Sequence, residues 1–165
     1  MEQTIILMSG IPASGKSTYI RAAMKKDTVP AVRVSRDDIR KALVGEDVNT
    51  SSYFSMEDEV FDNFVRLVNE AVTDGVGRIY VDATHINPAS RRKILSRINK
   101  RESLNLEVVV LDCAVEVAQA RNLNRAGFAQ VPRRAIYNMA HSYTVPTKEE
   151  LSIFNFKEVN IIKGE

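Results

Sequence analysis

The sequence lacks most of the features that mark secreted, membrane-spanning or repetitive proteins. It contains one cysteine, Cys113, so no disulfide can form within the chain, and a reducing cytosol is the expected compartment. The N-terminus has no basic segment followed by a long apolar one, which argues against a secretory signal. No apolar run approaches the ~20 residues that a membrane span needs, and we see no internal repeats or low-complexity segments. We therefore expect a cytoplasmic protein without a membrane segment.

The composition also lacks an excess of charge of either sign. The net charge is +2, which neither requires nor excludes a nucleic-acid partner, because local patches matter more than the sum. Charged residues make up 27% and apolar residues 44% of the 165 residues, as in globular proteins rather than disordered ones. We predict a single domain over residues 1–165, and the sequence does not indicate an oligomeric state.

The stretch that organises the sequence is Gly10–Thr18, which reads GIPASGKST and matches G-x-x-x-x-G-K-[ST] in full. An apolar run of strand length, Thr4–Met8, precedes it, and Ser17–Lys26, a segment without glycine or proline, follows it. A strand, a glycine-containing turn and a helix in this order are typical of a phosphate-binding loop. A chance match in an ordinary turn is the alternative, and the strand and helix on either side argue against it.

This loop predicts a site for ATP and Mg²⁺. Gly10 and Gly15 permit backbone angles that are closed to other residues, so the loop N–H groups can turn inward and cradle a phosphate. The helix that starts near Lys16 adds unpaired N–H groups and the positive end of its dipole. Lys16 is predicted to reach the β- and γ-phosphates, and the Ser17 hydroxyl to ligate Mg²⁺. The remaining predicted ATP-binding residues of the loop are Ala13, Ser14 and Thr18.

Apolar runs and helical patterns alternate along the rest of the chain. Strands are predicted at residues 4–8, 31–34, 78–81, 106–111 and 159–162. Helices are predicted at residues 17–26, 37–44, 55–74, 88–102, 115–124 and 132–143, with caps at Ser35 and Ser55 and a loop at 45–52. This alternation predicts a three-layer α/β fold with a parallel sheet of about five strands and helices on both faces. Ligands of such sheets bind at the carboxyl ends of the strands, so we look there for chemistry.

The end of the second predicted strand carries a carboxylate and an arginine one helical turn apart. Asp37 and Arg40 are three residues apart and therefore share a face of the short helix. Asp37 can take a proton from a hydroxyl nucleophile, and Arg40 can hold an anionic group of the acceptor with its two-pronged guanidinium. The alternative is that the aspartates only cap the helix and that Arg40 is a surface residue.

The third strand ends on Asp82, which we favour as the second residue of the Mg²⁺ site. Asp112, at the end of the fourth strand, competes for this role. Thr84, two residues after Asp82, is predicted to contact the acceptor. His85 is either a catalytic histidine or, more in line with a lone loop histidine, a polar residue without a role in the reaction.

Two arginines follow the fourth strand, and we predict a lid around residues 121–134. Arg121 and Arg125 are four residues apart, just before a glycine-containing loop, where cations could swing onto the phosphates. An exposed basic helix face is the alternative. Five further basic residues could line a groove for a phosphate backbone or simply face solvent: Arg91, Arg92, Lys93, Arg133 and Arg134.

Four segments together resemble the kinase domain of 5′-hydroxyl polynucleotide kinases of the phage and bacterial RNA-repair type. They are Gly10–Ser17, Ser35–Arg40, Val81–Pro88 and Arg121–Arg125. The resemblance runs from Ile5 to about Ala140 and implies a P-loop kinase fold with a short lid. One departure is His85, which stands where related sequences often have asparagine.

The resemblance implies a role for each matching residue. Lys16 and Ser17 would hold ATP and Mg²⁺, and Asp37 would be the general base. Arg40 would contact the phosphate next to the 5′-OH of an RNA or DNA acceptor. Arg125 would contact the donor phosphates, with Arg121 as a second contact.

Two other functions stay open from the residues alone. One is a kinase of a small-molecule hydroxyl, such as a nucleoside, a metabolite or an aminoacyl-tRNA. The other is a non-catalytic nucleotide-binding switch, which would need no acceptor-side base, so that Asp37 and Arg40 argue against it.

Overall fold

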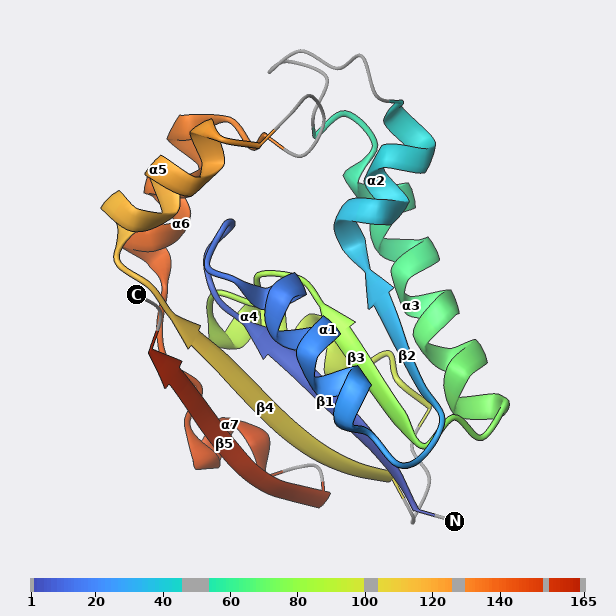
Figure 1. The fold of residues 1–165 in the computed structure, drawn as a ribbon. Helices are drawn as coiled ribbons and strands as arrows, with labels where there is room; N and C mark the ends of the chain where they lie inside the picture. Colours follow the sequence, from blue (N-terminus) through green and yellow to red (C-terminus); the bar gives the residue numbers. More distant parts are fainter. Residues whose placement is uncertain (1, 46–53, 100–103, 126–129, 153–154, 164–165) are drawn as a thin grey trace.

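The computed structural model describes residues 2–45, 54–99, 104–125, 130–152 and 155–163 (Figure 1). The strands are β1 (Gln3–Ser9), β2 (Ala31–Ser35), β3 (Arg78–Asp82), β4 (Leu104–Asp112) and β5 (Asn155–Lys163). The helices are α1 (Lys16–Lys26), α2 (Arg36–Val44), α3 (Glu57–Thr73), α4 (Pro88–Leu95), α5 (Val115–Leu123), α6 (Arg133–Ser142) and α7 (Lys148–Leu151). Among the described residues no helix is long and apolar enough to cross a membrane.

In the described part of the chain the five strands all run parallel, in the order β2-β3-β1-β4-β5 across the sheet. The central strand is β1, which leads into the predicted phosphate loop. Leu7 of β1 is in register with Val81 of β3, and Ser35 of β2 is in register with Asp82 at the end of β3. The residues that follow β1, β2 and β3 therefore meet at one edge of the sheet.

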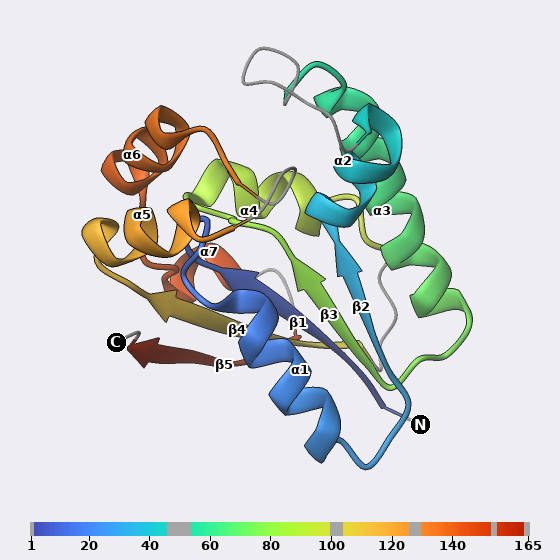
Figure 2. The ribbon, with the colours of Figure 1, turned by 45° about the horizontal axis from the view of Figure 1, so that its top comes forward.

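Side chains alternate along β1 and divide the core into two layers. Ile5 and Leu7 pack with apolar residues of α3, α4 and α7, whereas Ile6 and Met8 pack against α1 (Figure 2). All four side chains are almost fully buried, and each stabilises the fold by roughly 1.5–3 kcal/mol relative to an exposed side chain. Helices on both faces of a parallel sheet confirm the predicted three-layer α/β fold.

A third apolar cluster packs the α5–α6 pair against the phosphate loop. Ile11 and Ala13 of the loop cluster with Ala118 of α5, with Ile136 of α6 and with Val131, which precedes α6. The pair stands on one side of the loop and α2 stands on the other (Figures 1 and 2). Two separate parts of the chain thus face each other across the end of β1.

Three local expectations differ from the structure. Helix α4 ends at Leu95 rather than near 102, because the Asn69 side chain of α3 binds the backbone of the turn at Arg97 and Asn99. Helix α3 begins at Glu57 with no side-chain cap, so the predicted Ser55 cap is wrong, and the acidic first turn complements the helix dipole instead. Helix α7 was not predicted, since four residues are too few to show periodicity. Most of the predicted 45–52 loop lies outside the described residues.

His85 and Arg91 are buried and hold the loop that follows β3. The Arg91 side chain is 0% exposed, donates to the His85 carbonyl at 2.8 Å and forms an ion pair with Glu150 of α7 at 3.0 Å. Arg91 therefore cannot line a nucleic-acid groove, and that expectation is wrong. His85 donates from Nδ1 to the Met8 carbonyl at 2.6 Å and is 4% exposed, which supports the structural interpretation of this histidine.

Burial of His85 makes stability depend on pH. Burial lowers the pKa of His85 from 6.5 to about 3, so the folded protein keeps the ring neutral where the unfolded chain protonates it. The unfolded state then binds the extra proton between these two values, and stability falls as the pH drops below about 6.5. The loss is up to about 1.4 kcal/mol per pH unit for this one group.

We expect His85→Asn to flatten the acid side of the stability profile. His85 has a φ of 42°, a left-handed conformation that asparagine tolerates. Between about pH 7.5 and pH 5.5, urea unfolding should show a loss near 1.4 kcal/mol in the native protein that is absent from the variant, because the variant has no ring to protonate. The test compares slopes, so a difference in stability at neutral pH between the two proteins does not affect it. Equal slopes would contradict it.

Candidate active site

The loop after β1 has the backbone geometry of a phosphate cradle. Gly15 is the N-cap of α1 with a φ of 104°, and Ala13 also has a positive φ of 63°. Gly10 is needed for space rather than for its backbone angles, which corrects the prediction. A Cβ at Gly10 would lie 2.7 Å from Ser14 Oγ and 3.0 Å from the Leu111 carbonyl oxygen. Alternating handedness turns successive N–H groups toward one point, as anion-binding loops require.

Lys16 lies across this loop. Its Nζ donates to the carbonyls of Gly10 at 2.9 Å and Ile11 at 2.8 Å, and its side chain is buried. Burial lowers the pKa of Lys16 to about 8, against the opposing pull of Asp82 and Asp37. The ammonium is thus held at the mouth of the loop by neutral acceptors, where an incoming phosphate offers it stronger partners.

Ser17 and Asp82 form the predicted pair for a divalent cation. Ser17 Oγ lies 3.3 Å from the Asp82 carboxylate, which is 6% exposed. Asp112, the competing candidate, is exposed and is not among the residues that line the cavity around Lys16, Ser17 and Asp82. Within the described residues no group of three or more His, Cys, Asp or Glu side chains forms a metal site. A hydroxyl and one carboxylate fit Mg²⁺, which keeps water and phosphate oxygens as its other ligands. A guanidinium already contacts both oxygens, so this position accepts a cation.

That guanidinium belongs to Arg33 of β2, which the sequence did not single out. It donates to Asp82 at 2.8 Å and to Ser17 Oγ at 3.0 Å, and it pairs with Asp38 at 3.2 Å. A strand arginine has no sequence signal that would distinguish it from an exposed one.

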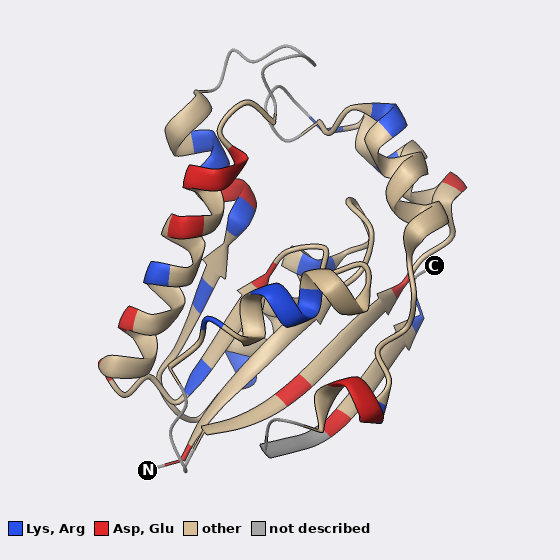
Figure 3. Ribbon diagram, turned by 180° about the vertical axis from the view of Figure 1, so that it is seen from behind, with Lys and Arg blue, Asp and Glu red and all other residues tan. Residues whose placement is uncertain are grey.

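On the acceptor side, Asp37 and Arg40 form the expected pair. Arg40 Nη1 lies 2.5 Å from Asp37, whose side chain is 62% exposed, and Arg40 itself is buried. Glu57, the first residue of α3, binds Arg40 at 2.6 Å and Arg36 at 3.0 Å. The Arg40 guanidinium also lies 5.6 Å from the ring centroid of Phe54. Figure 3 shows acidic and basic residues meeting where α2 packs on the start of α3.

These groups share one cavity of about 160 Å³. Its polar and charged lining comprises Lys16, Ser17, Arg36, Asp37, Arg40, Glu57, Asp82, Thr84 and Arg125, and its apolar lining includes Phe54, Val131 and Met139. The structure thus brings the residues of the phosphate loop together with those predicted to bind the cation and the acceptor. Thr18 is exposed on the first turn of α1, where it accepts from Arg21 at 3.5 Å.

The base of the predicted lid is anchored by a residue that the sequence reasoning missed. The buried Asn122 carboxamide donates to the Val131 carbonyl and accepts from its N–H, both at 2.8 Å. This clamp closes the segment between α5 and α6, of which residues 126–129 lie outside the described residues. Arg125 lines the shared cavity, while Arg121 donates to Cys113 Sγ at 3.9 Å and brings its Nη1 close to Gly15.

The remaining basic residues lie elsewhere. Arg133 and Arg134 are exposed and line a separate cavity of about 710 Å³ between α5 and α6, together with Tyr137. Arg92 and Lys93 are exposed on α4. Their proposed role along a phosphate backbone stays a prediction.

The sequence matches a protein-family model described as AAA domain over residues 5–146. The chain belongs to this AAA domain family. A curated relative, the L-seryl-tRNA(Sec) kinase of Methanococcus maripaludis, is 26% identical over 147 residues, which are 86% of this chain and 53% of the relative. The chain therefore spans about half the length of the curated relative that it matches.

Solved structures agree on the fold. A chain of a Pnkp1/Rnl/Hen1 complex superposes with a TM-score of 0.58 and 25% identity, over 73% of this chain and 39% of that chain. A fungal RNA kinase superposes with a TM-score of 0.68 at 12% identity, over 99% of this chain and 75% of that one. A sugar kinase from Janibacter sp. HTCC2649 superposes with a TM-score of 0.61 at 14% identity, over 99% of this chain and 86% of that one. The last two indicate the fold alone. The family match, the curated kinase relative and the chain of the Pnkp1/Rnl/Hen1 complex confirm a P-loop kinase domain that is similar to polynucleotide kinases.

The lowered pKa of Lys16 predicts how nucleotide binding depends on pH. ATP binds the charged ammonium more tightly than the neutral amine, so the dissociation constant for ATP should rise above about pH 8 in the native protein. The dissociation constant should rise by at most about tenfold per pH unit, since Lys16 takes up one proton when ATP binds. Lys16→Met keeps the length of the side chain and should bind weakly with a flat profile. Calorimetric titrations at several pH values test this, and parallel profiles would show that Lys16 does not face the phosphates.

Proposed function

We propose that this domain transfers the γ-phosphoryl group of ATP to a hydroxyl, and that the hydroxyl is the 5′-OH of RNA or DNA. One observation carries the proposal. Asp37, an exposed carboxylate positioned by the buried Arg40, shares a cavity with Lys16 and with the Ser17–Asp82 pair. A nucleotide-binding switch needs a phosphate loop but has no use for such a carboxylate.

The proposed reaction uses Asp37 as the general base. Its carboxylate accepts the proton of the acceptor hydroxyl while that oxygen forms a bond to the γ-phosphorus of ATP. The bond between the γ-phosphorus and the bridging oxygen breaks, and ADP leaves with the electron pair. Phosphoryl transfer depends mainly on alignment and charge stabilisation, which Lys16 and Arg125 would supply from the lining of the cavity. Ser17 and Asp82 would hold Mg²⁺, which offsets charge on the phosphate oxygens when bound.

The arginines beside Asp37 favour an acceptor that carries a phosphate. Arg40 and Arg36 are held side by side by Glu57, so two guanidinium groups face the cavity next to the base. Arginine is suited to phosphate because its fork makes two parallel hydrogen bonds. In a nucleic acid the first internucleotide phosphate lies directly beside the 5′-OH. The similarity to RNA-kinase structures adds support at the level of the fold.

A second candidate function follows from the curated relative. The relative is named as a kinase of the seryl group on a tRNA, and the match covers 86% of this chain. The acceptor could therefore be a hydroxyl other than the 5′-OH of a strand. Both candidates use the same loop and base, and the choice of acceptor in an assay separates them.

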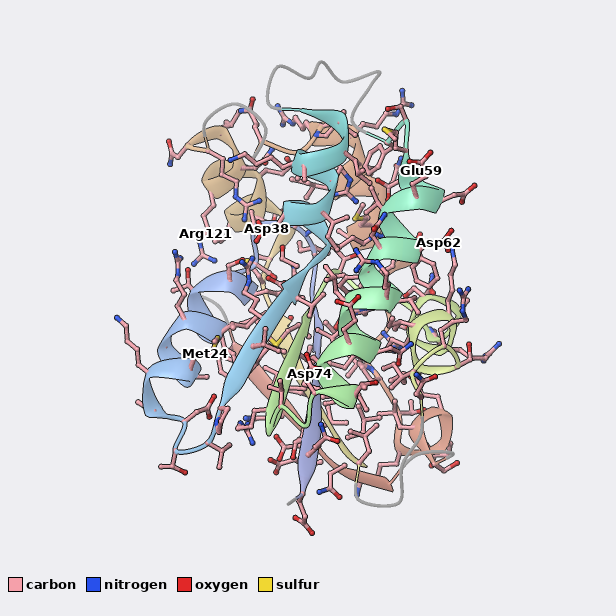
Figure 4. The ribbon with its side chains drawn as sticks, turned by 90° about the vertical axis from the view of Figure 1, so that its right-hand side faces the viewer. Met24, Asp38, Glu59, Asp62, Asp74 and Arg121 are labelled. Atoms are coloured by element: carbon pink, nitrogen blue, oxygen red, sulfur yellow. The ribbon has the colours of Figure 1, made fainter. Side chains whose placement is uncertain are left out.

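We expect Asp37→Asn to lower kcat by about 10²–10⁴-fold while ATP affinity stays nearly unchanged, because the amide keeps the size of the side chain but cannot take the proton. The matched control is Asp62→Asn, whose carboxylate is 71% exposed on the outer face of α3 (Figure 4). Turnover assays and ATP titrations on both variants are the measurement. Loss of ATP binding in Asp37→Asn would move this residue to the nucleotide side of the site.

We expect a nucleoside 3′-phosphate or a 5′-OH oligonucleotide to exceed the bare nucleoside in kcat/KM by roughly 10- to 100-fold. A charge-assisted contact with Arg40 contributes about 1.5–3 kcal/mol, and the bare nucleoside has no phosphate to receive it. Arg40→Ala should remove most of this gap, and Arg40→Lys should restore part of it. Arg66→Ala on the exposed face of α3 is the control.

The acceptor panel also includes seryl-tRNA and simple sugars. Equal rates for the nucleoside and its 3′-phosphate would contradict the role of Arg40. Phosphorylation of seryl-tRNA or a sugar alone would replace the polynucleotide proposal with the second candidate function or a small-molecule kinase.

A further inference from the structure

Arg33 occupies the position that the predicted cation would take. Its guanidinium contacts both members of the Ser17–Asp82 pair, with donors 3.0 Å from the hydroxyl and 2.8 Å from the carboxylate. The Nε and one terminal nitrogen share the same Asp82 oxygen, Oδ2, which also faces Ser17 Oγ. A divalent ion bound between these two oxygens would overlap the guanidinium. Arg33 and the ion are therefore mutually exclusive at this position.

Arg33 has a third partner, which can hold the guanidinium when Asp82 does not. Its other terminal nitrogen pairs with Asp38 on the first turn of α2 at 3.2 Å, and the Asp38 side chain is 70% exposed. The Arg33 side chain itself is 26% exposed, whereas Asp82 is almost fully buried. The guanidinium thus spans an inner carboxylate and an outer one. Release of Asp82 would leave Asp38 as the remaining carboxylate partner of the guanidinium.

We propose that Arg33 is an exchangeable counter-charge that keeps divalent cations out of the Ser17–Asp82 pair until nucleotide arrives, and that Asp38 receives it when the cation enters. The buried Asp82 carboxylate needs a positive partner in the free protein, because an unpaired buried charge is costly. Arg33 is that partner. A free cation must displace it with only two protein ligands, while a cation carried by ATP brings phosphate oxygens that complete its ligand shell.

This inference rests on the proposed function, in that the site takes Mg²⁺ together with ATP. It adds that Arg33 opposes the entry of a divalent cation that arrives without nucleotide. The free protein should then bind divalent cations weakly, although the Ser17 hydroxyl and the Asp82 carboxylate stand within reach of one another.

The test measures cation binding to the nucleotide-free protein, with Mn²⁺ as a paramagnetic probe and Mg²⁺ in competition. Arg33→Met keeps the apolar stem and removes the charge. We expect this variant to bind Mn²⁺ roughly tenfold more tightly or better, because the competing cation is gone and Asp82 is free. Arg66→Met, which removes a guanidinium from an exposed ion pair on α3, is the matched control and should bind as the native protein does.

Asp38→Asn supplies a second arm with the opposite sign. Without the outer carboxylate the guanidinium has only Asp82, so Mn²⁺ should bind several-fold more weakly than to the native protein. In the Arg33→Met background the Asp38→Asn change should have little effect on Mn²⁺ binding, because that protein has no guanidinium at position 33 for Asp38 to hold. The backbone N–H of Asp38, which caps α2 through Ser35, is unaltered in this variant.

Each outcome bears on the inference. Unchanged or weaker Mn²⁺ binding by folded Arg33→Met, checked by circular dichroism, overturns it. An Asp38→Asn effect of equal size in both backgrounds also overturns it, because Asp38 would then act on the cation directly. Cation binding is measured without acceptor or phosphoryl transfer. If the variants behave as expected and no acceptor is phosphorylated, only the proposed function fails.

Discussion

The parallel register of β1, β2 and β3 is the constraint on which the site depends. Because all three strands run the same way, their carboxyl ends meet at one edge, and Ser35 and Asp82 lie side by side there. The phosphate loop leaves β1 at the same edge, so its Ser17 comes within 3.3 Å of Asp82. A slip of one residue in β3 would turn the Asp82 side chain to the other face of the sheet. The buried apolar residues of these strands therefore fix the geometry of the candidate site as well as the fold.

Much of this arrangement was predictable because it depends on local patterns with a physical cause. The loop motif, the alternation of apolar runs with helical segments and the ends of the strands place Lys16, Ser17, Asp37 and Asp82 near one another without knowledge of the strand order. The sequence could not reveal which polar residues become buried. Arg91 looked like a surface cation, but its partner Glu150 comes from α7, a short helix 59 residues further along the chain.

The residues that sequence reasoning missed owe their roles to packing between distant elements. Glu57 holds Arg36 and Arg40 only because α3 packs on α2, and nothing in its own neighbourhood indicates an arginine partner. Asn122 clamps Val131 across a nine-residue separation. Even Gly10 is required by its neighbours, since the Leu111 carbonyl of β4 approaches the space where a Cβ would stand. In each case the partner is supplied by tertiary structure.

The charges of the site compensate one another before any ligand binds. Arg33 faces Asp82 and Asp38, while Arg36 and Arg40 face Glu57, and Arg40 also holds Asp37. Lys16, which burial drives toward its neutral form, rests on loop carbonyls. A phosphate therefore does not meet bare cations but exchanges places with carboxylates and carbonyls. The binding free energy of a phosphate is then the difference between the ion pairs formed with it and the internal ion pairs that it replaces. Removing one internal carboxylate can therefore strengthen the contact between an arginine and the phosphate, whereas removing another leaves that arginine less well positioned to make the contact.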